Sequence, residues 1–60
     1  MKTFIIYWVY YGIRGAEEGR IKVKARSEGQ AEQIFYNKNG SFNRDSMMGY
    51  VVEGVEEKVT

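Results

Sequence analysis

Residues 3–12, TFIIYWVYYG, are apolar or aromatic at nearly every position instead of at alternate positions. A strand with two apolar faces lies in the middle of a sheet, and each of its faces needs a cover. The rest of the chain offers one helix-forming segment, which is enough for one face. We therefore expect residues 3–12 to form a central strand whose second face is left for function.

The segments that follow predict a hairpin and a strand with one polar face. Residues 13–19, IRGAEEG, combine glycines with glutamates and are typical of a connection. Between positions 20 and 26, Ile21, Val23 and Ala25 alternate with basic residues. This alternation predicts a strand over residues 20–26 with four cations on one face: Arg20, Lys22, Lys24 and Arg26.

A short helix is predicted over residues 28–38. Ser27 is a suitable N-cap, and Gln30 stands at the spacing of a capping box. Ala31, Ile34 and Phe35 then recur at the spacing of an apolar helical stripe. Asn39 and Gly40 follow as a left-handed C-terminal stop, so the helix has about two to three turns.

The last third of the chain predicts one more strand. Residues 41–46, SFNRDS, form a polar connection in which Phe42 is expected to fold back as a cap on the core. Residues 47–53 form the third strand, with Met48, Tyr50 and Val52 on one uncharged face. Residues 54–60 are polar and are expected to fray.

These elements predict a single α+β domain over residues 1–60 with the order β-β-α-β. A right-handed crossover from the second strand to the third leaves room for the first strand between them. We therefore expect a three-stranded mixed sheet in the order 2-1-3, with the helix packed on one face. In this arrangement the strand at residues 3–12 is central, as its apolar pattern requires.

A hairpin register that pairs Trp8 with Val23 and Tyr10 with Ile21 decides which side chains the helix covers. It places Phe4, Ile6, Trp8 and Tyr10 beneath the helix, whereas a slip of one residue would invert both faces. The opposite face then carries aromatic residues beside the basic row. The predicted partner-binding residues on that face are Tyr7, Val9, Tyr11, Arg20, Lys22, Lys24 and Arg26, accompanied by Ile5 and Val51.

Composition and charge narrow the chemistry. The 60 residues include no cysteine and no histidine, so the usual zinc ligands and disulfide bonds are absent, and a reducing cytoplasm is the expected location. The longest apolar run is far shorter than the roughly 20 residues of a membrane-spanning helix. Separated acidic pairs and glycines outside the phosphate-binding motifs indicate no catalytic residues, cofactor or metal. We expect a binding protein and not an enzyme.

Three kinds of partner fit the predicted open face. A larger protein would use the tyrosines as anchors and the cations as a rim. Single-stranded nucleic acid would stack its bases on the tyrosines and place its phosphates on the basic row, although the net charge of +1 favours it less. A second copy of the chain would make the face a homodimer seam.

A resemblance to known proteins follows from the layout of the chain. A basic strand, RIKVKARS, runs directly into a capped helix, SEGQAEQIFY, and the chain then has a last strand, MMGYVV. This order and length resemble small accessory proteins of phages and mobile elements, among them antitoxins and anti-defence inhibitors. The resemblance implies a protein that inhibits or modulates a host protein in the host cytoplasm, and it assigns no site residues.

Overall fold

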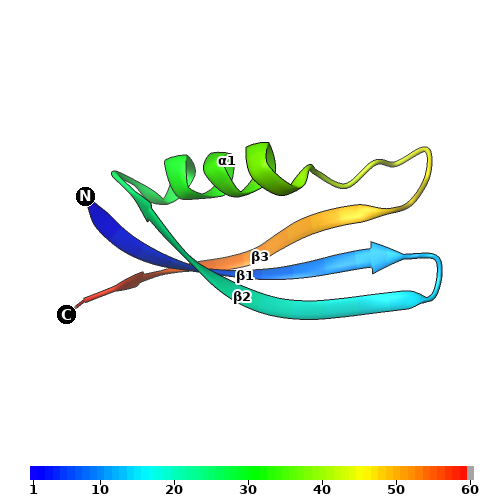
Figure 1. The fold of residues 1–60 in the computed structure, drawn as a ribbon, viewed down its shortest axis with the longest axis horizontal. Helices are drawn as coiled ribbons and strands as arrows, with labels where there is room; N and C mark the ends of the chain where they lie inside the picture. Colours follow the sequence, from blue (N-terminus) through cyan, green and yellow to red (C-terminus); the bar gives the residue numbers. More distant parts are fainter. Residues whose placement is uncertain (60) are drawn as a thin grey trace.

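The computed structural model describes residues 1–59 and contains one sheet with a single helix on one side (Figure 1). The elements are β1 (Lys2–Gly12), β2 (Gly15–Ala25), α1 (Glu28–Asn39) and β3 (Gly49–Lys58). The strand order is β2-β1-β3, so the predicted α+β fold with a central first strand is confirmed. Both ladders of β1 are antiparallel. Within residues 1–59, β2 and β3 therefore run in the same direction, but they are separated by β1 and do not pair with each other.

The hairpin between β1 and β2 turns within two residues. Gly12 pairs with Gly15, so that only Ile13 and Arg14 form the turn, and Gly15 has a φ of 126° that favours glycine. The predicted connection over residues 13–19 is therefore wrong, because β2 already begins at Gly15. Its glycines and glutamates resemble a loop in composition but lie in the ladder.

The short turn also changes the strand register. Phe4 pairs with Val23 and Trp8 pairs with Gly19, so the predicted pairing of Trp8 with Val23 and of Tyr10 with Ile21 is wrong by four residues. Four is an even number, and side chains alternate with a period of two. The predicted assignment of side chains to the two faces of the sheet is therefore retained.

The predicted bounds 47–53 of the third strand are wrong at both ends: β3 begins at Gly49, because Met47 lies in a turn with a φ of 57°, and it continues to Lys58 through residues that were expected to fray. Tyr7 pairs with Gly54 and Trp8 with Val52, which leaves Glu53 as the extra residue of a β-bulge. After the bulge, Val55 returns to the core side. A single inserted residue breaks the strict alternation, and this explains why the alternating pattern ends at Glu53.

The helix is confirmed almost as predicted. The backbone N–H of Gln30 donates to Ser27 Oγ at 3.2 Å, and the N–H of Arg26 donates to Gln30 Oε1 at 2.6 Å. The first is the N-cap bond of the predicted capping box, whereas the Gln30 side chain reaches one residue further back than in that motif, to Arg26 instead of to the N-cap Ser27. At the other end, Gly40 has a φ of 87° and its N–H donates to the carbonyl of Tyr36 at 2.7 Å.

The core lies between α1 and the sheet, and its buried members are Phe4, Ile6, Ala25, Ala31 and Phe35. Ile34, predicted to join it, is 38% exposed instead. Tyr36 takes its place because its ring packs against the core while its hydroxyl accepts a hydrogen bond from Val52 N–H at 2.8 Å. A tyrosine supplies both an apolar ring and a polar tip, which isoleucine lacks.

Aromatic rings extend this core toward the hairpin. The Tyr50 ring lies 5.4 Å from that of Trp8, 4.8 Å from that of Tyr10 and 5.6 Å from that of Phe35, measured between ring centroids. Tilted and edge-to-face pairs of this kind contribute about 0.5–1.5 kcal/mol each beyond the area they bury. Trp8 and Tyr10 therefore lie on the helix side, as predicted.

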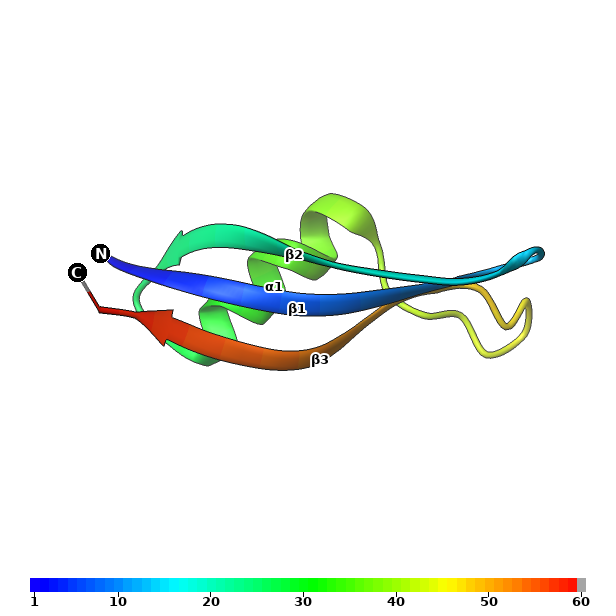
Figure 2. The same cartoon turned by 90° about the horizontal axis from the view of Figure 1, so that it is seen from below.

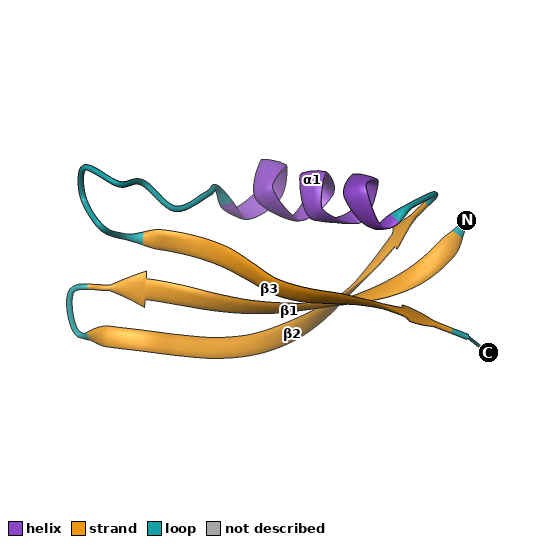
Figure 3. Cartoon of the chain, turned by 180° about the vertical axis from the view of Figure 1, so that it is seen from behind, coloured by secondary structure: helices purple, strands orange, loops and turns teal. Residues whose placement is uncertain are grey.

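The molecule is elongated, with extents of 38 × 17 × 14 Å. Both termini lie at one end, and the hairpin turn and the loop at residues 40–48 lie at the other (Figure 3). Seen from the side opposite α1, the sheet presents β1 in the middle with β2 and β3 beside it, and no other described segment covers it (Figure 2). We call this side the open face.

Candidate functional site

The central strip of the open face comes from β1. Ile5, Tyr7, Val9 and Tyr11 point to this side because they alternate with the core residues of the same strand. The two tyrosines are 36% and 39% exposed, whereas Val9 is 8% exposed. Tyr7 and Tyr11 therefore offer contact surface, and Val9 fills the space between them.

The basic row comes from β2 and lies directly beside this strip. Arg20 is paired with Tyr7, and Lys22 is paired with Ile5. Lys24 follows opposite Thr3 at the end of the sheet where the termini lie. Arg26, predicted to extend the row, lies beyond the last residue of β2, where its backbone N–H donates to the side chain of Gln30. The row therefore consists of three cations.

Strand β3 completes the open face and adds a cation that was not predicted from the sequence. Val51 is paired with Val9, Glu56 with Ile5, and Lys58 with Thr3. Lys58 belongs to the segment expected to fray. The apolar Val55 between Gly54 and Glu56 is a signal in the sequence that this segment continues the strand.

Lys22 and Lys58 approach each other over Ile5. The pKa of Lys58 lies below its ordinary value of 10.5. The larger cause is a hydrogen bond with the Lys22 side chain, and the next is repulsion by the charge of Lys22. With Arg20, they line a hollow of about 370 Å³ above Ile5. Among residues 1–59 the only ion pair joins Lys2 and Glu57, at 3.6 Å. The cations of the hollow therefore lack a side-chain carboxylate partner within this part of the chain.

The hairpin end of the open face is apolar. Phe42 packs edge-to-face on Tyr11, with ring centroids 5.8 Å apart, so its predicted role as a cap on the core is wrong. Met47 lies beside them with a φ of 57° and is 66% exposed. These residues and Val51 line a second hollow. Phe42 belongs to the loop at residues 40–48, which leads from α1 to β3 at the hairpin end of the molecule (Figure 3).

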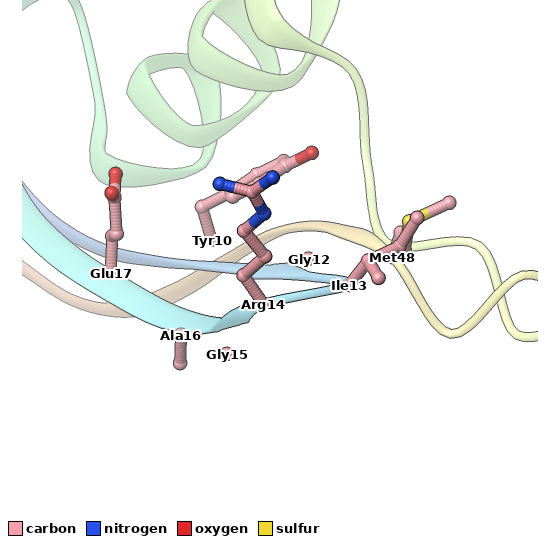
Figure 4. Close-up of a pocket in the computed structure, with 8 residues that line it drawn as sticks. All are labelled: Tyr10, Gly12, Ile13, Arg14, Gly15, Ala16, Glu17 and Met48. Atoms are coloured by element: carbon pink, nitrogen blue, oxygen red, sulfur yellow. The ribbon is translucent and has the colours of Figure 1, made fainter.

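A further hollow lies at the tip of the hairpin, on the helix side of the sheet. Figure 4 shows Tyr10, Arg14 and Glu17 rising from the hairpin toward that side, while Ala16 points away from it. Ile13 and Met48 complete its wall. The hollow is separated from the open face by the strands themselves, so it does not belong to the same surface.

The open face therefore has exposed tyrosines along β1 that can make apolar contacts, and charged side chains on the two outer strands. It has a basic corner at the termini and an apolar end at the hairpin, joined by Tyr7. Of the predicted binding residues, the structure brings together Tyr7, Val9, Tyr11, Arg20, Lys22 and Lys24. Lys58, Phe42 and Met47 are the additions.

Other features that could mark a function are a metal site, a membrane-spanning helix and a known relative. Within residues 1–59, no three histidine, cysteine or acidic side chains gather as they would to hold a metal ion. No helix among these residues has the length and apolar character needed to span a membrane. No protein-family model matches the chain, and no curated protein or solved structure matches it. The open face is therefore the basis for a functional proposal.

Proposed function

We propose that this chain is a small, non-enzymatic protein-binding module that attaches to a larger protein through the open face and modulates it. The observation that carries the proposal is the central strand β1, which is apolar on both faces while α1 covers only one. Tyrosine and arginine are among the residue types that dominate the energy of protein interfaces, and this face has half-exposed tyrosines, one of them paired with Arg20. Exposed apolar patches on small domains usually mark such interfaces.

The charges on the face favour a protein over a nucleic acid. Glu18 lies beside Val9, and Glu56 lies beside Ile5. Glu53 lines a hollow together with Tyr7 and Arg20. A phosphate backbone presents only negative charge and would meet these carboxylates unfavourably. A protein surface offers both signs and can pair with a mixed margin.

The side chains of the chain favour an inhibitor over an enzyme. The chain has neither histidine nor cysteine, and Ser27, one of its three serines, serves as a helix cap. These features favour binding over nucleophilic or acid–base catalysis. We place the chain among inhibitors of the antitoxin or anti-defence kind, encoded by a phage or mobile element and acting in the host cytoplasm.

A photo-crosslinking experiment tests the surface without the identity of the partner being needed. A benzophenone amino acid replaces Tyr7 in one variant and Gln33, an exposed residue of α1, in a matched control. Irradiation in a lysate of the host cells should give one dominant protein adduct from position 7 and none from position 33. The adduct should disappear when excess unmodified chain competes. Equal adducts from both positions would contradict the proposal.

A second candidate rests on the pairing of Tyr7 with Arg20, which places an aromatic ring beside a cation as single-strand binders do. Nuclease treatment before irradiation distinguishes it, because a protein adduct survives and a nucleic-acid adduct is lost. Binding through phosphates also weakens steeply with salt, whereas a mainly apolar contact does not. Light scattering over a range of concentrations reveals whether the face is instead occupied by a second copy.

A further inference from the structure

The basic corner of the open face has the geometry of an anion site. Arg20 and Lys22 stand two positions apart on the same side of β2, and Lys58 reaches over from β3 on the far side of β1. Together they surround Ile5, which forms the apolar floor of a hollow of about 370 Å³. Three cations around one hollow repel each other until an anion enters.

Two of these cations, Lys22 and Lys58, lie close enough for one to lower the pKa of the other. The neighbouring Lys22 side chain lowers the pKa of Lys58 from its ordinary value, mainly through a hydrogen bond and additionally through charge repulsion. No side-chain carboxylate of residues 1–59 lies within ion-pair distance of these groups. Glu56 is paired with Ile5 in the ladder but forms no ion pair with the lysines. A partner carboxylate would relieve the repulsion that the chain itself leaves uncompensated.

We infer that Arg20, Lys22 and Lys58 form a carboxylate-recognition site for an acidic segment of the protein partner. This inference rests on the proposed function and names the chemistry of the partner. A carboxylate placed between the two ammonium groups forms charge-assisted hydrogen bonds with both, and Arg20 is able to bind a second carboxylate through its planar guanidinium. The apolar side chains next to that carboxylate lie on Ile5 and Tyr7.

The compactness of the corner favours a carboxylate over a phosphate backbone. The cations gather around Ile5 instead of forming a continuous track, since Glu18 ends the row on β2 and the apolar hollow of Tyr11, Phe42 and Met47 follows. A nucleic-acid strand needs positive charge along its whole path. A short acidic peptide motif needs positive charge only where its carboxylates bind.

The inference is tested with a hexaglutamate peptide as the probe. The peptide is titrated into the isotope-labelled full chain at low salt, and the lysine 13Cε resonances report where it binds. We expect the largest shifts at Lys22 and Lys58, and a rise in the pKa of Lys58 in the complex. The Lys22→Gln/Lys58→Gln variant should bind the peptide at least about fivefold more weakly. Lys38→Gln, on the last turn of α1, should bind as the unmodified chain does.

The controls separate this inference from the proposed function. Equal shifts at Lys38 and Lys22, or unchanged affinity of the double variant, would overturn the carboxylate site even if Tyr7 still captures a protein. Tighter binding of a thymidine hexanucleotide than of hexaglutamate would overturn it in favour of nucleic acid. Peptide binding at Lys22 and Lys58 without any adduct at Tyr7 would keep the site and contradict the proposed surface.

Discussion

The indole ring of Trp8 lies across Gly19, its partner in the ladder between β1 and β2. A Cβ atom on Gly19 would stand 2.5 Å from Cζ2 of Trp8, which is closer than side-chain atoms approach. The ring has little room to retreat, since its other neighbour is Tyr50, 5.4 Å away between centroids. The glycine that resembled a loop residue is therefore the platform on which the tryptophan packs.

Gly19→Ala is expected to destabilise the protein by about 1–3 kcal/mol, because the added methyl group displaces the ring. Urea unfolding followed by circular dichroism measures the loss. In a Trp8→Leu background the same change should cost much less, since the ring that it displaces is gone. An equal cost in both backgrounds would show that the indole does not set the penalty.

Gly49 is required at the start of β3 for two reasons. Its φ of 132° is unfavourable for other residues, and a Cβ atom there would stand 2.6 Å from the carbonyl oxygen of Ser41 and 2.7 Å from Cα of Phe42. Gly49→Ala should therefore cost at least about 2 kcal/mol. Gly29→Ala, in the first turn of α1 with no atom within 4 Å of the new group, should instead stabilise by about 0.5 kcal/mol. Melting temperatures that move in the same direction would contradict these two assignments.

The hydroxyl of Tyr36 ties α1 to the bulged region of β3 through Val52. Tyr36→Phe should leave the Val52 N–H without its partner and cost about 1–2 kcal/mol. Amide hydrogen exchange should accelerate at Val52 more than elsewhere in β3. Tyr11→Phe, which removes a hydroxyl on the exposed face, is the control and should leave the exchange of Val52 unchanged. Equal exchange at Val52 in both variants would contradict the bond.

The apolar pattern of β1 and the period of two explain why the strand order and the two faces could be predicted. The exact register could not, because it depends on the length of the turn. The segment from Gly15 to Gly19 has loop-like composition and a strand conformation. Only the close approach of Trp8 to Gly19, a tertiary contact, reveals why a glycine lies there.

The residues of the candidate site on β1 and β2 could be predicted from the sequence, whereas Lys58 and Phe42 at its two ends could not. Tyr7, Tyr11 and the row on β2 follow from alternation. Lys58 was missed because the bulge at Glu53 breaks the alternation that would have carried β3 onward. Phe42 was assigned to the core because a loop aromatic has no periodicity, and its contact with Tyr11 depends on the path of the loop.

The contact between Lys22 and Lys58 predicts a dependence of stability on pH. The pKa of Lys58 is lower in the folded chain than its ordinary value of 10.5, so between these values the unfolded chain holds a proton that the folded chain has released. The free energy of unfolding should therefore rise with pH through that window. Lys24 on β2 and Glu56 on β3 also face this corner, whereas Thr3 on β1 is neutral.

Urea unfolding at several pH values below 10.5 measures this rise, and 13Cε chemical shifts give the pKa of Lys58 directly. Lys22→Gln should raise the pKa of Lys58 toward its ordinary value and remove the corresponding part of the rise, because Lys22 is the source of the two largest causes of the shift. Lys38→Gln should leave both unchanged. An unshifted Lys58 in the unmodified chain would show that the two ammonium groups do not meet.

The proposed function requires that the open face bind a protein through its tyrosines. The decisive quantity is the affinity of the crosslinked partner, once purified, for the unmodified chain and for Tyr7→Ala/Tyr11→Ala, measured by calorimetry. Both tyrosines lie outside the core, so the variant should keep its circular dichroism spectrum. We expect its affinity to fall at least about thirtyfold, as the loss of two aromatic anchors implies. Unchanged affinity in a folded variant would contradict the proposed function.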